Sequence, residues 1–133
     1  MSGLIGLAES RTGVIGKTID ERRAKAWGNF NGGGTPDFRS DYNFSTITDN
    51  GVGKYFLNFV VNMTNADYAW CGFAALPGAY FDDVAIVAQD NSYNNSTSQL
   101  QLSTMIAINP DSASSPKFVL GDCVDVSVIV FGE

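Results

Sequence analysis

The stretch Val124-Asp125-Val126-Ser127-Val128-Ile129-Val130-Phe131 decides the class of fold. Its four valines, at every second position, share one face of an extended strand, because successive side chains point to opposite faces. The stretch from Gln99 to Asn109 alternates in the same way, with Leu100, Leu102 and Ile106 on one side. Both stretches have the two-residue period of a β-strand, and neither has the 3.6-residue period of a helix.

Further runs of strand length, separated by turn residues, fill the chain from residue 24 onward. The clearest turn is Asp49-Asn50-Gly51-Val52-Gly53, because asparagine and glycine tolerate the positive φ angles of hairpin turns. About seven strands without an amphipathic helix predict an all-β fold of the sandwich or barrel type. We take an antiparallel β-sandwich as the prediction. The further runs are 26–31, 42–47, 54–61, 68–75, 84–89 and 117–120.

Length and composition place this sandwich in a single domain. The chain has 133 residues, of which 44% are hydrophobic and 17% charged, and this is enough apolar material for one core. We assign residues 24–133 to the β-sandwich. Residues 1–23 are assigned to an extended N-terminal arm that ends in a charged connector, in which a short helical turn is compatible with the residues.

The arm repeats a pattern of two aliphatic residues between glycines. Ser2-Gly3-Leu4-Ile5-Gly6 recurs ten residues later as Thr12-Gly13-Val14-Ile15-Gly16. Interior glycines disfavour a helix by about 1 kcal/mol each, and the pattern is too short to close a sheet of its own. A loose terminus is the alternative to a docked arm. The residues predicted to dock onto another subunit are Gly3, Leu4, Ile5, Gly6, Gly13, Val14, Ile15 and Gly16.

The charge balance argues against two classes of partner. Eight basic and fourteen acidic residues give a net charge of −6, whereas binding to phosphates or to an anionic membrane surface needs clustered lysine and arginine. The longest apolar runs are far shorter than the roughly 20 residues that span a bilayer. We therefore expect no nucleic acid as a partner and no membrane insertion. The first residues do not have the pattern of a secretory signal peptide.

The sequence contains no histidine, and this removes Ser-His-Asp and Cys-His catalytic arrangements and every His-ligated metal site. Cys71 and Cys123 are expected to be buried free thiols, with a disulfide between them as the alternative. The adjacent pair Asp82-Asp83 is not placed as the two separated carboxylates of a glycosidase. We expect no enzymatic activity, no catalytic residues, no metal and no cofactor.

Two loops combine aromatic side chains with amides and carboxylates, the groups that bind sugars. The first holds Tyr80, Phe81, Asp82 and Asp83, and the second holds Tyr93, Asn94 and Asn95. These residues are the candidate contacts to a host receptor or surface glycan. Ordinary polar turns are the alternative, because asparagine and serine are common turn residues.

The second face of the last strand carries Ile129 and Phe131 beside Asp125 and Ser127. One face of a sandwich strand normally meets water, so large apolar side chains there favour a covering partner. Together with the arm, this favours an oligomer.

Three stretches carry a resemblance to a known group of proteins. They are Ala24-Lys25-Ala26-Trp27-Gly28-Asn29-Phe30-Asn31-Gly32, then Phe44-Ser45-Thr46-Ile47-Thr48-Asp49-Asn50-Gly51-Val52-Gly53-Lys54-Tyr55 with Asn58-Phe59, and Asn65-Ala66-Asp67-Tyr68-Ala69. The sequence resembles a module of tailed-bacteriophage virion proteins, and the glycine-rich opening is similar to a leader on tail-fibre and related virion proteins. The likeness covers about residues 1–70.

The resemblance implies a non-enzymatic structural protein of the virion, assembled in the cytoplasm of the host bacterium. Such proteins usually belong to tail-fibre or receptor-binding assemblies and are commonly homotrimers. The expected function is therefore a small tail-fibre or receptor-binding component that its arm anchors to tail or baseplate proteins. A capsid decoration protein that stabilises the head is the alternative, and a free carbohydrate-binding lectin is the third hypothesis.

Overall fold

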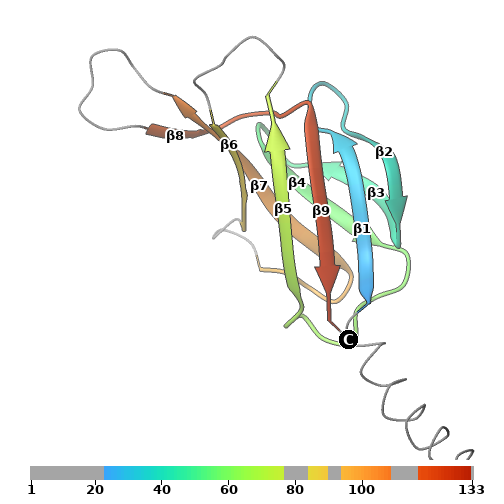
Figure 1. The fold of residues 1–133 in the computed structure, drawn as a ribbon. Coiled ribbons are helices and arrows are strands. Elements are labelled where there is room, and N and C mark those ends of the chain that lie inside the picture. The colour runs from blue at the N-terminus through green and yellow to red at the C-terminus, as the bar shows by residue number, and fades with distance from the viewer. Residues whose placement is uncertain (1–22, 77–83, 90–93, 109–116, 133) are drawn as a thin grey trace, which may run out of the picture.

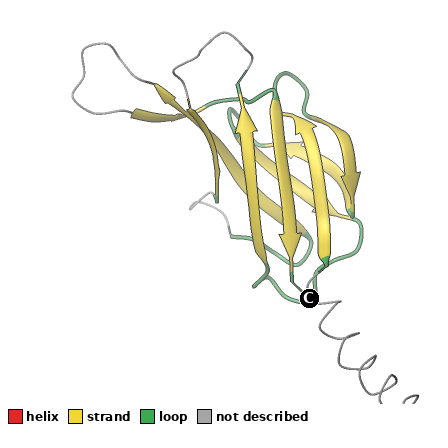
Figure 2. Ribbon diagram, in the orientation of Figure 1, coloured by secondary structure: helices red, strands yellow, loops and turns green. Residues whose placement is uncertain are grey.

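The computed structural model describes residues 23–76, 84–89, 94–108 and 117–132. Every regular element within these residues is a strand, and they contain no helix (Figure 2). Nine strands follow one another along the described chain (Figure 1): β1 (Ala24–Asn31), β2 (Asp37–Tyr42), β3 (Phe44–Asp49), β4 (Lys54–Phe59), β5 (Ala69–Ala75), β6 (Val84–Ala88), β7 (Gln99–Ile108), β8 (Lys117–Leu120) and β9 (Asp125–Phe131).

The strands form two antiparallel sheets that pack face to face, which confirms the predicted β-sandwich. The first sheet has the order β2-β1-β9-β5, and the second has the order β3-β4-β7-β6. The short strand β8 pairs with the second half of β7, from Met105 to Ile108. It lies along the same edge of β7 on which β4 pairs with the first half, from Gln99 to Ser103. In the first sheet Ala24, Phe131 and Ala69 lie side by side at one end, which we call the arm end. Asp125 and Ala75 pair at the opposite end, the far end.

The described residues form nine strands, whereas about seven were predicted. The run predicted from Tyr42 to Ile47 is divided at Asn43 between the end of β2 and the start of β3, and the rest of β2 was not predicted. Asn43 adopts a φ of 60° between β2 and β3, and this turn carries the chain from the first sheet to the second. β2 is an edge strand with mostly exposed polar residues, and of its side chains Phe38 packs against the core. A strand with one inward apolar residue has no alternation to detect.

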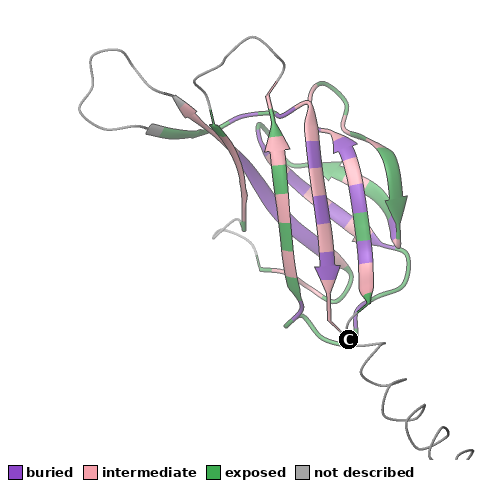
Figure 3. Ribbon diagram, in the orientation of Figure 1, coloured by how far each residue is buried: buried purple, intermediate pink, exposed green. Residues whose placement is uncertain are grey.

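The core lies between the two sheets and is filled by alternate residues of the central strands. Val126, Val128 and Val130 of β9 are buried, as the period of the sequence predicts, and Leu100 and Leu102 of β7 belong to the same core cluster. Figure 3 shows the buried positions on both strands. Rings then continue the core toward the edge, in edge-to-face and stacked contacts with centroids 5.2–6.0 Å apart. The aromatic residues in this series are Tyr55, Phe30, Phe38, Phe44, Phe59 and Tyr68.

The two cysteines are both free thiols, as expected, but they are not both buried. Cys123 is fully buried beside the core, and burial raises the pKa of its thiol. Cys71 is exposed, so the expectation of a second buried thiol is wrong. The reason is the register of β5, which turns Cys71 outward and the neighbouring Gly72 toward Val128 in the core.

The predicted hairpin between β3 and β4 is confirmed, and its positive φ angles fall on Gly51 and Gly53 rather than on Asn50. The Asp49 carboxylate accepts the Gly51 N–H at 2.9 Å, which closes the turn. The carbonyl of Gly53 accepts the Thr104 N–H at 2.8 Å, and the Thr104 carbonyl accepts the Gly121 N–H at 3.2 Å. At Thr104, therefore, the strand next to β7 on this edge changes from β4 to β8.

Asp122 connects the core to the place where β4, β7 and the segment after β8 meet. Its Oδ1 accepts the Gly53 N–H at 2.7 Å and lies 3.0 Å from the Tyr55 hydroxyl, which also lies 2.9 Å from the Gly32 carbonyl. Burial, and next the hydrogen bond to Asp122, raise the pKa of Tyr55, so its hydroxyl stays protonated and remains a donor.

Replacement of Asp122 by alanine is expected to lower the free energy of unfolding by about 2 kcal/mol, because the buried Gly53 N–H loses its acceptor. Urea denaturation followed by tryptophan fluorescence measures this loss. Asp122→Asn is the matched control, since it keeps the accepting oxygen and is expected to stay within about 1 kcal/mol of the unmodified chain. Equal losses in the two variants would contradict the role given to this oxygen.

Candidate functional site

The sequence-predicted site residues fall only partly within the described chain. The arm residues from Gly3 to Gly16, the loop from Tyr80 to Asp83, and Tyr93 lie outside the described residues. Asn94 is exposed, and Asn95 is half-buried with its side-chain oxygen accepting the Gln101 N–H at 3.1 Å. Asn95 therefore helps to hold the start of β7, which is the ordinary structural use of a turn amide.

The two predicted contact loops join the sandwich at opposite ends. The loop with Tyr80 follows β5, whose last residue Ala75 lies at the far end. The loop with Asn95 precedes β7 and lies at the arm end, where the Met63 N–H donates to the Thr97 carbonyl at 2.8 Å beside the start of β1. These loops therefore do not join the sandwich at one shared surface.

The outer face of the first sheet carries a row of apolar side chains. The strand register places Tyr42, Trp27, Ile129 and Cys71 next to one another across all four strands of this sheet. Residues directly opposite in a ladder project from the same face, so the four side chains form one continuous row. Trp27 is 40% exposed and Tyr42 is 56% exposed. Such a row on the water-facing side of a sheet makes this face the candidate interaction surface.

A shallow hollow of about 350 Å³ lies in this face, over β1, β9 and β5. Phe73, which is 67% exposed, stands next to Ser127 in the register and borders the hollow together with Trp27. Figure 3 shows exposed and half-buried residues alternating along β5, beside the buried positions of β9. The full lining, which defines the term hollow below, is Trp27, Gly28, Asn29, Cys71, Gly72, Phe73, Ser127, Val128 and Ile129.

Toward the far end the hollow gives way to a polar cluster. Asn29 donates from its side-chain nitrogen to Asp125 and, at 2.8 Å, to Ser127. Arg39 forms an ion pair with Asp125, at 3.2 Å between Nη1 and Oδ1, and donates to the carbonyl of Val124. The negative charge of Asp125 is therefore offset by Arg39, and the hollow itself is lined without an ionisable acid or base apart from the Cys71 thiol.

The sequence predicted part of this face, namely Ile129, and missed Trp27 and Phe73. The inward positions next to Trp27 and Phe73 hold glycines, because a Cβ at Gly28 would lie 2.9 Å from the Phe38 ring and one at Gly72 would lie 2.7 Å from the Ser127 carbonyl. The large side chains of Trp27 and Phe73 therefore project outward, although large apolar side chains usually face the core. A signal was available in the glycines that follow Trp27 and precede Phe73, since a glycine within a strand marks a close approach.

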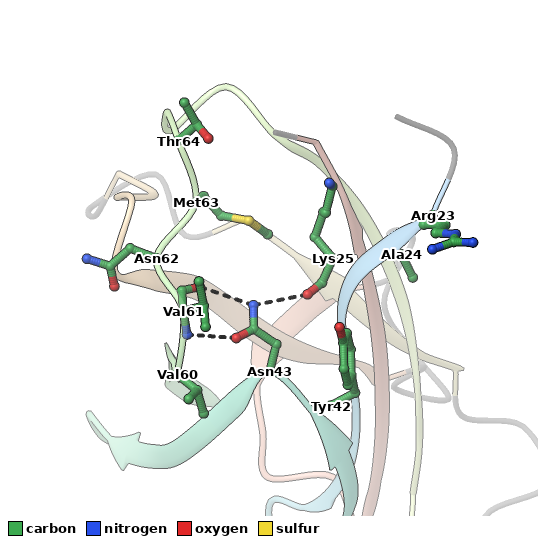
Figure 4. A pocket seen from close by; sticks show the side chains of 10 residues that line it. All are labelled: Arg23, Ala24, Lys25, Tyr42, Asn43, Val60, Val61, Asn62, Met63 and Thr64. Atoms are coloured by element: carbon green, nitrogen blue, oxygen red, sulfur yellow. Dashed lines mark hydrogen bonds between the residues drawn. The ribbon is translucent and has the colours of Figure 1, made fainter. Parts of the chain in front are cut away.

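A second depression, of about 550 Å³, lies at the arm end where β1 begins (Figure 4). Asn43 forms its floor and joins three segments: it donates to the carbonyls of Lys25 and Val61, at 3.0 and 3.1 Å, and accepts the Val61 N–H at 2.7 Å. Exposed Val60 and Val61 and the side chain of Arg23 border it. The chain from the arm enters the sandwich at this depression.

The titratable groups do not form a catalytic arrangement within the described residues. Burial raises the pKa values of Tyr55, Tyr68 and Cys123, and all three side chains serve the core or its edge. Among the described residues no group of three potential ligands is placed to hold a metal ion. No helix of the described chain is long and apolar enough to cross a membrane.

Comparisons with known proteins add nothing to the geometry of the site. No protein-family model, no curated protein and no solved structure matches this chain. The described surface features are an apolar hollow, a neutralised polar cluster and a depression where the arm enters.

Proposed function

We propose that this chain is a structural protein of a tailed-bacteriophage virion, without catalytic activity. It acts as a small tail-fibre or receptor-binding component that works as a homotrimer, and its arm docks on tail or baseplate proteins. The proposal combines the sequence likeness over residues 1–70 with the exposed apolar face of the first sheet. That face is the observation that carries it, since a row of apolar side chains including Trp27 and Ile129 on the outer face of a sheet favours a covering partner.

The placement of the arm supports the same function. The arm enters at the start of β1, at the arm end, and the loop with Tyr80 to Asp83 joins strands β5 and β6 from the far end. In a protein anchored through its arm, the last residue of β5, Ala75, lies at the end of the first sheet opposite the anchor. Under the proposal, Leu4, Ile5, Val14 and Ile15 bury their side chains on the neighbouring virion protein.

Deletion of residues 1–16 is expected to abolish incorporation into the particle while leaving the sandwich folded, because β1 begins only at Ala24. Purified particles carrying the full chain or the deleted chain are compared by immunogold electron microscopy, and the free chains by thermal denaturation. A fourfold variant with serine at Leu4, Ile5, Val14 and Ile15 is the matched control for loss of length. It is expected to fail in the same way.

Each outcome of this experiment decides the proposal. Label on the tail that disappears with residues 1–16 supports it. Label on the head identifies the decoration protein instead. Full incorporation of the deleted chain overturns the role of the arm. A chain that never enters particles, and that binds a glycan array equally well with and without residues 1–16, is a free lectin.

A further inference from the structure

The hollow on the outer face of the first sheet lies between two aromatic side chains. Trp27 of β1 and Phe73 of β5 stand on either side of the central strand β9. Ile129 of β9 pairs with Trp27 in the register, and Ser127 of β9 pairs with Phe73. Both aromatic side chains are exposed. A small molecule in the hollow therefore meets an apolar wall on two sides, with a floor that contains one hydroxyl group.

The side of the hollow toward the far end is polar, and hydrogen bonds already hold its groups in place. The Asn29 side-chain nitrogen donates to Ser127 Oγ at 2.8 Å and to Asp125 Oδ1. Ser127 accepts in this contact, so its hydroxyl hydrogen can be donated to a ligand. Within the described residues Asp125 is contacted through Oδ1, by Asn29 and by Arg39, so its Oδ2 can accept from a ligand. The cluster therefore offers one donor and one acceptor beside the apolar walls.

The ligand that fits these groups carries no net charge. Arg39 lies 3.2 Å from Asp125 and offsets its charge, so a cation finds the carboxylate already paired. An anion is repelled by a chain with a net charge of −6. The class of ligand that remains is neutral and has both an apolar face and hydroxyl groups.

We infer that the hollow binds one neutral pyranose ring of a host surface glycan. The C–H groups on one face of the sugar ring lie against the Trp27 indole, because the face of an aromatic ring is electron-rich. A sugar hydroxyl donates to Asp125 and another accepts from Ser127. The inference rests on the proposed function, which includes receptor binding, and it names the chemical class of the partner that covers this face. It places the receptor contact on the sheet, apart from the two predicted loops.

Polarity favours a sugar over an apolar side chain of another protein. An apolar side chain would fill the hollow, but it would also cover Ser127 and Asp125 without giving them hydrogen-bond partners. Covering a polar group without a partner is unfavourable. A sugar ring contacts the walls and pairs with both polar groups, so it uses the whole lining.

The size of the hollow limits the ligand to one ring that is held weakly. Its volume of about 350 Å³ is near the lower end of the range of roughly 300–1,000 Å³ for ligand sites. Because the hollow is shallow, a bound ring keeps part of its surface in water, and we expect a Kd on the order of 1 mM for a single site. The three sites of a homotrimer on one glycan-covered surface would bind together far more tightly.

The first test probes the full-length chain with a glycan array that carries neutral and acidic glycans. Each hit is then titrated as its methyl glycoside and followed by NMR. The chain has two tryptophans, and their indole N–H signals serve as reporter and internal control. The Trp27 signal is expected to shift with sugar concentration, whereas that of Trp70, which packs against the core, stays in place. Trp27→Phe assigns the two signals.

Three variants test the contacts. Trp27→Ala is expected to weaken binding by about tenfold or more, because the ring loses its apolar wall, and Ser127→Ala by about fivefold, because one hydrogen bond is lost. Tyr42→Ala is the matched control, since Tyr42 is an exposed aromatic residue in the same row and lies outside the lining of the hollow. It is expected to bind as the unmodified chain does. Circular dichroism and thermal denaturation verify that each variant is folded.

The outcomes separate this inference from the proposed function. Binding of neutral glycans that is lost in Trp27→Ala and kept in Tyr42→Ala supports the inference. An array without a neutral hit, a preference for acidic glycans, or undiminished binding by Trp27→Ala overturns it. Incorporation into particles is measured independently, so a chain that enters the tail without binding a neutral glycan overturns this inference alone.

The thiol of Cys71 allows the hollow to be blocked chemically. Cys71 is exposed and belongs to the lining, whereas Cys123 is buried and is expected to stay unlabelled. Attachment of a maleimide to Cys71 is expected to abolish sugar binding, and Cys71→Ser treated in the same way is expected to retain it. If the labelled chain binds the methyl glycoside as well as the unlabelled chain does, the sugar lies elsewhere and the inference is overturned.

Discussion

Replacement of Gly53 by alanine is expected to lower the free energy of unfolding by about 4 kcal/mol or more, a large part of the 5–15 kcal/mol typical of a folded domain. Its φ of +65° costs an alanine about 1–2 kcal/mol. The larger cost is steric, because a Cβ at this position would lie 2.6 Å from the Thr104 carbonyl oxygen and 2.8 Å from the Gly121 nitrogen. Both atoms belong to the backbone, which cannot rotate aside as a side chain does.

Urea denaturation of Gly53→Ala, followed by tryptophan fluorescence, measures this loss. The matched control is Gly34→Ala, since Gly34 has a similar φ of +73° and no atom within 4 Å of the added Cβ. The control is expected to lose only the conformational cost of about 1–2 kcal/mol. If the two variants lose the same amount, the junction between β4, β7 and β8 is less tightly packed than described.

The second large effect is expected at Asn43, where alanine should lower the free energy of unfolding by about 3–4 kcal/mol. The substitution removes three side-chain hydrogen bonds, to the carbonyls of Lys25 and Val61 and from the Val61 N–H. It also places an alanine at a φ of 60°, where asparagine is better tolerated. The hydrogen bonds contribute about 1 kcal/mol each and the backbone conformation about 1 kcal/mol.

Asn43→Gly separates the two contributions, because glycine adopts this φ without strain but makes no side-chain hydrogen bond. It is expected to be about 1 kcal/mol more stable than Asn43→Ala and still well below the unmodified chain. Chemical denaturation of the three proteins measures both differences. A stability of Asn43→Ala within about 0.5 kcal/mol of the unmodified chain would show that the joint between the sheets does not depend on this side chain.

Much of the sandwich follows from the sequence, because its central strands obey the two-residue period. Val126, Val128 and Val130 are buried and Ile129 projects outward, as the alternation predicts. β2 could not be predicted in this way, because it lies at an edge and Phe38 is the apolar residue that it turns inward.

The apolar surfaces were harder to predict, since they depend on how the strands are placed relative to one another. Trp27 and Phe73 project outward because Gly28 and Gly72 occupy the crowded inner positions, and that crowding comes from residues distant in the sequence. The run 84–89 was predicted as a strand, and β6 spans Val84–Ala88. β8 takes the place of β4 beside the second half of β7, and no local pattern in the sequence records where along β7 this change occurs.

The position of β1 has a mechanical consequence for a protein held by its arm. β1 lies between β2 and β9 and is hydrogen-bonded to both, and the arm joins it at its first residue. Tension that enters through the arm toward a load at the far end acts along β1, at right angles to its ladder hydrogen bonds. Those bonds on both sides then resist in shear and must rupture together, whereas a peripheral strand pulled sideways would unzip one bond at a time.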